Sequence, residues 1–327
     1  MSELRWHPLR REWVMTATHR MERTFLPPPS ECPLCPSKEG RQTEIPREDF
    51  DIVVFENRFP SLFPNPPASS VSSSELYKVK PSRGVCEVIV YTPEHTGSLA
   101  TQSLERIYRL FLVWQDRFRE LSQLPYVRYV YIFENKGKEV GVTLHHPHGQ
   151  IYAFPFIPPV IRNEIRSLRE HKRKKGRCLI CDIGEREKEE NRVIIESPFH
   201  IAFVPFFARW PYEVFLMPKT HIPSLDEYDE EKLFDLAQIL KAVLLKYDNL
   251  FSFSLPYMMV MHQRPSKDKS GLFHYHIEFY PPYRSKDKLK YLASVESGAG
   301  NFINDSHPED KAKELRELPP FSIEEVE

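Results

Sequence analysis

The chain has 327 residues, of which 41% are hydrophobic and 13% aromatic, so it can bury one large core or two of ordinary size. Its 45 basic and 46 acidic side chains leave a formal net charge of -1, which offers no electrostatic footprint for nucleic acid or an anionic membrane. The N-terminus is charged where a signal peptide needs an apolar run, and no stretch reaches the roughly 18 consecutive apolar residues of a membrane helix. We therefore expect a cytoplasmic protein with a small-molecule partner.

The first half of the chain carries a cysteine pair, Cys32 and Cys35, in the stretch "CPLC". In a reducing compartment a C-x-x-C pair indicates metal ligation or redox chemistry and not a disulfide framework. A proline- and serine-rich stretch, residues 63–75, is expected to be a loop or a strap. A strand-like run with the lone Cys86 follows at residues 84–99, "GVCEVIVYTPEHTGSL".

A helix is predicted after this run, because five apolar side chains step by three and four and gather on one face: Leu104, Ile107, Phe111, Trp114 and Phe118. A strand is predicted over residues 126–133, and a histidine-rich strand, "HHPHGQIYAF", over residues 145–154. The charged stretch at residues 170–177 is expected to be a solvated connector.

The second half repeats this order of elements. Glu87 and Glu213 each lie eight residues before a histidine, and each of these histidines is followed by x-x-Ser-Leu. The repeated features are a cysteine pair (Cys178 and Cys181), a run with His221 (210–225), an acidic-capped helix (229–250), a strand (256–262) and "FHYHIEFY" (273–280). The chain is therefore a degenerate internal repeat.

Strands that follow one another through short turns favour an antiparallel sheet over a doubly wound parallel one. We predict an α+β fold with a mainly antiparallel sheet and flanking helices. Two pseudo-symmetric halves, residues 1–165 and 166–327, would join their sheets side by side.

Equivalent positions of the two halves offer two cysteines and two histidines each, which is the ligand set of a tetrahedral zinc site. The first set is Cys32, Cys35, His95 and His146, and the second is Cys178, Cys181, His221 and His274. The alternatives are reduced bystanders or redox-active pairs. Neither pair starts a helix after a βαβ strand, which argues against the redox alternative.

The strand at residues 145–154 also predicts a nucleophile. Because side chains alternate along a strand, His146, His148 and Gln150 would point the same way, while His145 faces away and stays unassigned. With His146 held as a ligand, His148 is free, and a mostly neutral imidazole can attack phosphorus. Gly149 would keep the backbone open to a phosphate, and Gln150 would donate to its oxygens. The alternative is a polar but inert strand end.

The motif H-P-H-G-Q, with an upstream asparagine and C-x-x-C, resembles the galactose-1-phosphate uridylyltransferase family, the transferase branch of the histidine-triad superfamily. The resemblance covers nearly the whole chain and implies histidine-triad-like halves. It includes "RREWVMTATHRMERT", "CPLC", "VFENRFPSL", "VIVYTPEH", "ARWPYEVFLMPK", "LLKYDNLF" and "FYPP".

The resemblance implies a ping-pong mechanism of the Leloir pathway of galactose metabolism. His148 would attack the α-phosphorus of UDP-glucose, form a uridylyl-histidine and release glucose 1-phosphate. Galactose 1-phosphate would then take the uridylyl group and leave as UDP-galactose. Gln150 stands where histidine-triad hydrolases carry a third histidine, because a sugar phosphate leaves as an anion without a proton donor.

The resemblance also implies binding residues. Asn135 and Thr143 would lie near the transferring phosphate, and Asn57, Arg20 and Arg23 would serve the nucleotide and phosphates. Lys290 and Glu296 would bind sugar across the interface of a homodimer with composite active sites.

The chain departs from the family pattern at three places. Phe302 stands where the family has a glutamine, which bears on sugar selectivity, and the second cysteine pair occurs in relatives that act as ADP-glucose phosphorylases. Some members bind iron through a glutamate and three histidines. The matching positions hold one histidine fewer and form either an additional iron or zinc site or a buried polar cluster: Glu164, His262, His276 and Glu278.

Two other functions remain open from the sequence. A nucleotidyl phosphorylase would use inorganic phosphate as the acceptor in place of a sugar phosphate. A zinc-stabilised nucleotide-binding scaffold would have lost catalysis, although the presence of His148 and Gln150 argues against it.

Overall fold

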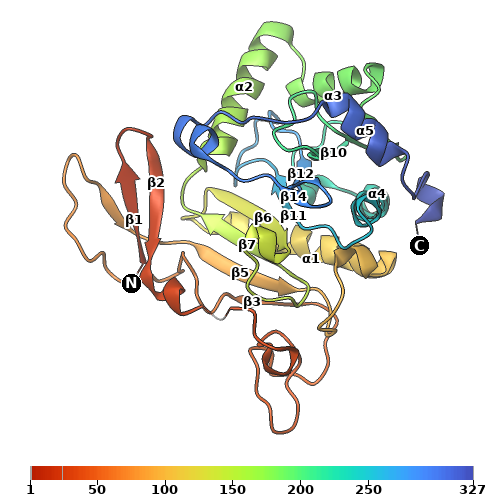
Figure 1. The fold of residues 1–327 in the computed structure, drawn as a ribbon. Helices are drawn as coiled ribbons and strands as arrows, with labels where there is room; N and C mark the ends of the chain where they lie inside the picture. The colour runs from red at the N-terminus through yellow and green to blue at the C-terminus, as the bar shows by residue number, and fades with distance from the viewer. Residues whose placement is uncertain (1, 24, 327) are drawn as a thin grey trace.

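A nine-stranded antiparallel sheet forms the centre of the computed structural model, which describes residues 2–23 and 25–326 (Figure 1). Across the sheet the order is β3 (Val53–Glu56), β5 (Val85–Val90), β7 (His148–Phe154), β6 (Tyr129–Lys136), β11 (Tyr257–His262), β12 (His276–Tyr280), β10 (Val214–Pro218), β9 (His200–Phe203) and β8 (Val193–Glu196). Every neighbouring pair is antiparallel.

The two halves meet at the pairing of β6 with β11, where Asn135 lies opposite Met258. From this seam the strand order is the same outward on both sides, since β7 and β5 mirror β12 and β10. The predicted α+β fold, with two pseudo-symmetric halves whose sheets join side by side, is therefore confirmed. The histidine-rich strands begin later than predicted, at His148 and His276.

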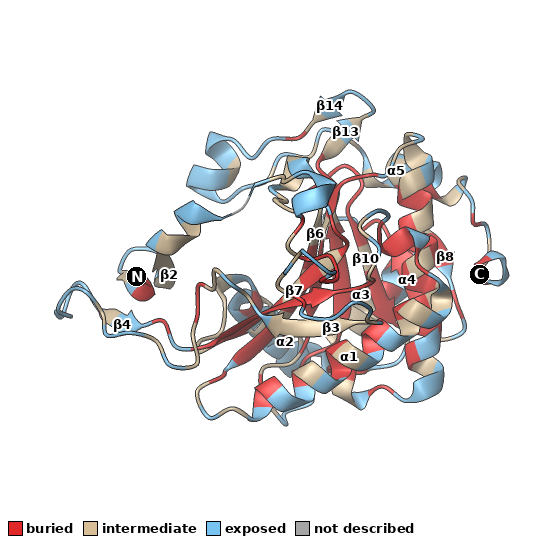
Figure 2. Cartoon of the chain, turned by 90° about the horizontal axis from the view of Figure 1, so that it is seen from below, coloured by how far each residue is buried: buried red, intermediate tan, exposed pale blue. Residues whose placement is uncertain are grey.

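Two long helices, α1 (Leu104–Gln123) and α4 (Glu230–Leu250), cover one face of the sheet (Figure 2). Each has a capped start, because Ser103 accepts from the backbone N–H of Arg106 and Asp229 from that of Lys232. Four residues of the predicted apolar stripe of α1 are buried, and Leu104 is partly buried. Burying a large apolar side chain stabilises the fold by about 1.5–3 kcal/mol.

The opposite face of the sheet packs against α2 (Pro159–Lys175), whose Ile161 and Leu168 join Tyr152 in a second core. The expected solvated surface at residues 170–177 is confirmed, because these residues are mostly exposed, but α2 continues through most of the stretch. Its charged side chains lie largely on the exposed side, and Gly176 ends the helix with a φ of +71°. Helix α3 (Leu179–Glu189) follows and contacts α2.

The remaining elements lie around the main sheet. A small sheet of β1 (Ser2–His7), β2 (Glu12–Ala17) and β4 (Val79–Pro81) projects to one side (Figure 1), and the loop at residues 63–75 leads to it. The C-terminal part holds the pair β13 (Tyr283–Ser285) and β14 (Lys288–Leu289), then α5 (Pro308–Arg316). Short helical turns are η1 (Thr18–Glu22), η2 (Pro29–Glu31), η3 (Leu99–Thr101), η4 (Lys138–Val140), η5 (Leu225–Glu227), η6 (Val295–Ala299) and η7 (Ile323–Glu325). Within the described part of the chain, none of the helices combines the length and apolar character needed to span a bilayer.

Candidate active site

His148 stands at the first position of β7, where two cavities meet. We call the first the Asn57 cavity; it is lined by Arg23, Pro33, Leu34, Glu44, Asn57, Arg58, Phe59, Val88, Thr143, Leu144, His148 and Gln150. We call the second the Asn135 cavity; it is lined by Gly97, Ser98, Glu134, Asn135, Lys136, Gly137, Val142, Leu144, His145, His146, Pro147, His148 and Ser254. A ligand in either cavity can therefore reach the His148 imidazole.

The hydrogen bonding of His148 defines which nitrogen is available for chemistry. Its Nδ1 lies 2.7 Å from the backbone oxygen of His146. Because a carbonyl only accepts, Nδ1 carries the proton and Nε2 keeps its lone pair. Burial lowers the pKa of His148, and the positive charge of Arg23 lowers it further. The ring is therefore neutral near pH 7 and can act as a nucleophile at Nε2.

Gln150 and Asn57 form one hydrogen-bonded unit in the Asn57 cavity. Asn57 Nδ2 donates to Gln150 Oε1 at 3.4 Å, and the backbone N–H of Phe59 donates to Asn57 Oδ1 at 2.8 Å. With the oxygen of its amide engaged, Gln150 offers its N–H groups as donors to a ligand.

The two predicted arginines take different places. Arg23 lines the Asn57 cavity and donates to Thr143 Oγ1 at 3.3 Å, so both predicted phosphate ligands are near each other. Arg20 instead donates to the backbone oxygen of Phe59 at 2.7 Å and approaches the Tyr152 hydroxyl at 3.4 Å. Arg20 is not among the lining residues of either cavity, so its contact with the site runs through the loop that holds Phe59.

Asn135 lines the Asn135 cavity together with His148. Lys290 and Glu296 do not reach His148 within the chain. Lys290 Nζ lies 3.3 Å from Glu296 Oε1 and also donates to the Ile303 carbonyl, and neither residue lines either cavity.

Gly149 has a different role from the one that the sequence suggested. A Cβ atom at Gly149 would lie 2.1 Å from the hydroxyl oxygen of Tyr91, on the face of the sheet opposite the Asn57 cavity. The expectation that this glycine opens the backbone to a phosphate is therefore wrong. The residue is a glycine because the tyrosine occupies the space behind it.

The first predicted metal cluster comes together as expected. The ligand atoms of Cys32, Cys35, His95 and His146 lie within 4.8 Å of one another. His146 Nε2 lies 2.7 Å from the Thr92 carbonyl, so its Nδ1 keeps a lone pair that faces Cys35 Sγ at 3.5 Å. Burial raises the pKa of Cys32 to about 11, an environment in which a thiolate needs a bound cation. These four residues fit a tetrahedral metal.

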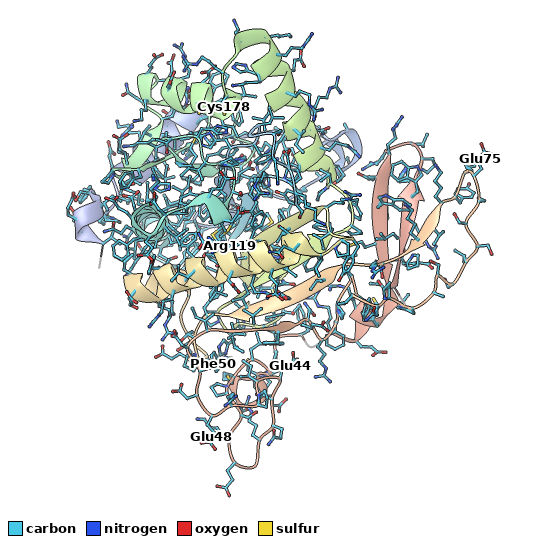
Figure 3. All side chains as sticks on the ribbon, turned by 180° about the vertical axis from the view of Figure 1, so that it is seen from behind. Glu44, Glu48, Phe50, Glu75, Arg119 and Cys178 are labelled. Atoms are coloured by element: carbon cyan, nitrogen blue, oxygen red, sulfur yellow. The ribbon has the colours of Figure 1, made fainter. Side chains whose placement is uncertain are left out.

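The second cluster, Cys178, Cys181, His221 and His274, repeats this arrangement, with all ligand atoms again within 4.8 Å. His274 and His221 direct Nε2 to the carbonyls of Pro218 and Gly271 at 3.1 and 3.0 Å. Cys178 lies at the start of α3, beside α2 (Figure 3). This pair does begin a helix, but that helix follows α2 and not a β-strand, so the redox alternative gains no support.

The third cluster contains Glu164, His262, His276 and Glu278, with all ligand atoms within 4.8 Å. His262 Nδ1 lies 2.8 Å from Glu164 Oε1 and 3.3 Å from Glu278 Oε1. Burial opposes protonation of His262, but the two carboxylates outweigh it and raise its pKa to about 9. Arg209 lies 3.0 Å from Glu278 Oε2. Arg209 also lies 3.5 Å from Glu213 Oε1, so a proton on His262 and the Arg209 charge offset only part of the carboxylate charge here.

The sequence interpretation missed Glu44, Arg58 and Val88 as cavity residues. Arg58 belongs to the stretch "VFENRFPSL", and Val88 lies two positions after Cys86 on β5. Both therefore lie in stretches that the sequence analysis had already singled out. Glu44 had none, because the long loop below β3 brings it to the cavity (Figure 3). Its carboxylate lies 3.9 Å from the Arg58 guanidinium, and burial raises its pKa.

Comparison with known proteins covers almost the whole chain. Residues 1–158 match the family model described as galactose-1-phosphate uridyl transferase, N-terminal domain, and residues 164–325 match the C-terminal domain of the same family. The galactose-1-phosphate uridylyltransferase of Thermotoga maritima is 46% identical over 319 residues, covering 97% of this chain and 98% of the relative. The galactose-1-phosphate uridylyltransferase of Haemophilus influenzae is 34% identical, and the match covers 98% of this chain and 95% of the relative.

Two solved structures are also similar over their full length. One, described as a uridylyltransferase, has a TM-score of 0.85 and 35% identity and covers 96% of this chain and 97% of its own. The other is an ADP-glucose phosphorylase from Arabidopsis thaliana with bound ADP-glucose. It has a TM-score of 0.76 and 25% identity, and the match covers 98% of this chain and 99% of its own.

Proposed function

The chain belongs to the galactose-1-phosphate uridylyltransferase family and is a uridylyltransferase, and on this premise we propose that it works by a ping-pong mechanism with His148 as the nucleophile. The observation that carries the proposal is the orientation of the imidazole. Nδ1 donates to the His146 carbonyl, and the ring lies where two cavities meet.

In the first half-reaction, Nε2 of His148 attacks the α-phosphorus of UDP-glucose. A P–N bond forms while the bond from the α-phosphorus to the bridging oxygen breaks, and its electron pair leaves with glucose 1-phosphate. No proton donor is needed, because the leaving phosphate is a stable anion. The Nδ1–H···O=C hydrogen bond stabilises the positive charge on the substituted ring.

In the second half-reaction, a phosphate oxygen of galactose 1-phosphate attacks the same phosphorus, the P–N bond breaks, and UDP-galactose forms. Arg23, Thr143 and the Gln150 amide donate to the phosphate oxygens as charge develops on them. Asn135 serves the same phosphate from the Asn135 cavity. Asn57 and Arg20 serve the nucleotide, directly for Asn57 and through the Phe59 loop for Arg20.

We further propose that zinc occupies both Cys₂His₂ clusters. Two thiolates and two imidazole Nδ1 atoms suit zinc in each case, and backbone carbonyls hold the outer nitrogens of three of these histidines. A zinc ion with four protein ligands supplies no bond to the substrate, so its contribution is structural. The third cluster is proposed as a buried polar network, because His262 pairs with Glu164 and Glu278 and Arg209 pairs with Glu278.

The proposal includes a homodimer whose partner segment, around Lys290 and Glu296, completes the sugar site. In its support, apolar side chains of this segment are exposed, with Tyr291 at 71% and Leu292 at 49%. In this scheme residues 1–165 carry the nucleophile and the first zinc, and residues 166–327 carry the second zinc and the sugar segment. We propose that the enzyme acts in the cytoplasm, in the Leloir pathway.

A nucleotidyl phosphorylase is the competing function, and one observation favours it. The similar structure of an ADP-glucose phosphorylase from Arabidopsis thaliana covers 98% of this chain. The two functions share the nucleotidyl-histidine and differ in the nucleotide that is bound and in the acceptor, which is a hexose phosphate or inorganic phosphate.

One experiment separates these functions. The enzyme is incubated with UDP-glucose or ADP-glucose alone, and an adduct is sought by mass spectrometry on the peptide that contains His148. Galactose 1-phosphate or inorganic phosphate is then added. A uridylyl adduct that only galactose 1-phosphate discharges is expected. Absence of any adduct on the wild type overturns the mechanism, and discharge by phosphate alone establishes the phosphorylase.

A further inference from the structure

A buried group of polar side chains that the proposed mechanism does not use lies directly behind the catalytic strand. Glu134, on β6, is 4% exposed, also borders the Asn135 cavity, and accepts two hydrogen bonds. The hydroxyl of Tyr91 donates to its Oε2 at 3.3 Å, and the hydroxyl of Tyr257 donates to its Oε1 at 3.2 Å. The Lys136 ammonium lies 5.2 Å from the centroid of the Tyr257 ring and forms an ion pair with Asp248 Oδ1 at 3.0 Å.

Tyr91 is fixed from several sides. Its backbone N–H donates to the Pro147 carbonyl at 3.1 Å, which extends the pairing of β5 with β7 beyond Val90 and His148. Its ring meets Trp114 of α1 edge-on, with ring centroids 6.1 Å apart. Tyr91 is 1% exposed, so its ring and hydroxyl lie within the core.

The Tyr91 hydroxyl occupies the place where any other residue at position 149 would carry its Cβ. That Cβ would lie 2.1 Å from Tyr91 Oη and 3.1 Å from the Phe133 carbonyl oxygen. Both neighbours are rigid, one a clamped ring and the other backbone. A side chain at 149 must therefore push β7 toward the two cavities and move His148 and Gln150 with it.

We infer that Tyr91 is a positioning residue for uridylyl transfer: its hydroxyl, held by Glu134, supports the backbone at Gly149 and so sets the distance of His148 and Gln150 from the reacting phosphorus. The inference rests on the proposed role of His148. It assigns a functional reason to a buried Tyr–Glu–Tyr group that would otherwise be only core packing. A shift of about 1 Å at a nucleophile can cost on the order of 100-fold in rate.

A double-mutant cycle on the full-length enzyme tests this. Gly149→Ala is expected to lower kcat about 100-fold while KM for UDP-glucose changes less than about threefold. Gly149→Ala with Tyr91→Phe removes the 2.1 Å contact and is expected to regain at least about tenfold. Recovery stays incomplete because Tyr91 Cζ and the Phe133 oxygen remain at 3.1 Å.

Tyr257→Phe is the matched control, because it removes the other hydroxyl from the same carboxylate but does not face Gly149. Gly149→Ala with Tyr257→Phe is expected to stay as slow as Gly149→Ala. Wild-type activity in Gly149→Ala, equal recovery in both double variants, or recovery in neither would overturn the inference. Absence of a His148 adduct on the wild type would instead overturn the proposed mechanism.

Should Gly149→Ala fail to fold by circular dichroism, the single tyrosine variants carry the test. Tyr91→Phe is then expected to lower kcat at least about fivefold more than Tyr257→Phe, with KM for UDP-glucose alike in both. Equal kcat in the two variants would overturn the inference.

Discussion

His148 and His276 make the same hydrogen bond in the two halves of the molecule. The Nδ1 atom of His148 lies 2.7 Å from the carbonyl of His146, and that of His276 lies 2.9 Å from the carbonyl of His274. The free nitrogens differ, since His276 Nε2 meets the Glu278 carboxylate at 3.2 Å while His148 opens on two cavities. The second half therefore repeats the hydrogen bond of the imidazole, but the other ring nitrogen of His276 faces a carboxylate.

The first prediction follows from this pair. His148→Asn is expected to keep the fold and lose transfer by a factor on the order of 10⁴ or more, because no other group replaces Nε2. His276→Asn is the matched variant and is expected to keep the burst of glucose 1-phosphate. Rapid-quench measurement with UDP-glucose gives both results. A burst in His148→Asn would show that another residue is the nucleophile.

Substitution of Arg23 and substitution of Arg20 should have different effects on kcat and on the pH–rate profile. Arg23→Ala removes a cation that lines the Asn57 cavity and is expected to lower kcat by about 100-fold. It also removes a charge that lowers the pKa of His148. That pKa should therefore rise, and the acidic limb of the pH–rate profile should move to higher pH.

Arg20→Ala is the control, because Arg20 contacts the Phe59 carbonyl and lines neither cavity. We expect mainly a higher KM for UDP-glucose and an acidic limb at its wild-type position. Equal shifts of the limb in both variants would contradict the assignment.

The cysteines predict a metal count. Wild-type enzyme should contain about two zinc ions per chain, and Cys35→Ser should contain about one, with a lower Tm, because a structural zinc contributes to folding. Cys86→Ser is matched in burial but lies outside both clusters and should keep both ions. Elemental analysis of the purified variants measures this. Two ions in Cys35→Ser would remove the first site from the proposal.

Glu134 predicts a pH dependence of stability. Burial raises its pKa to about 7, against an ordinary 4.5, despite the nearby Lys136 charge and the two tyrosine donors. The folded protein therefore holds a proton that the unfolded chain has lost. This contribution to stability is complete below pH about 4.5 and is lost by pH about 7.

Glu134→Gln has no carboxyl group to titrate. Its free energy of unfolding should therefore fall less between pH 5 and 7 than that of the wild type. The effect should amount to a few kcal/mol at most, and urea unfolding at several pH values measures it. Parallel curves for the variant and the wild type would show that Glu134 ionises normally.

The sequence by itself determined the repeat and both Cys₂His₂ sets, because the two halves carry the same residue types in the same order, and it predicted His148 as the nucleophile from the HPHGQ strand. Only the tertiary structure decided that Arg23 and not Arg20 faces the cavity, that Lys290 pairs with Glu296, and why residue 149 is a glycine. Tyr91 and Glu134 are 43 positions apart, and no local pattern reports their contact behind β7. Side chains from distant segments meet there only because β5, β6 and β7 pair in one sheet.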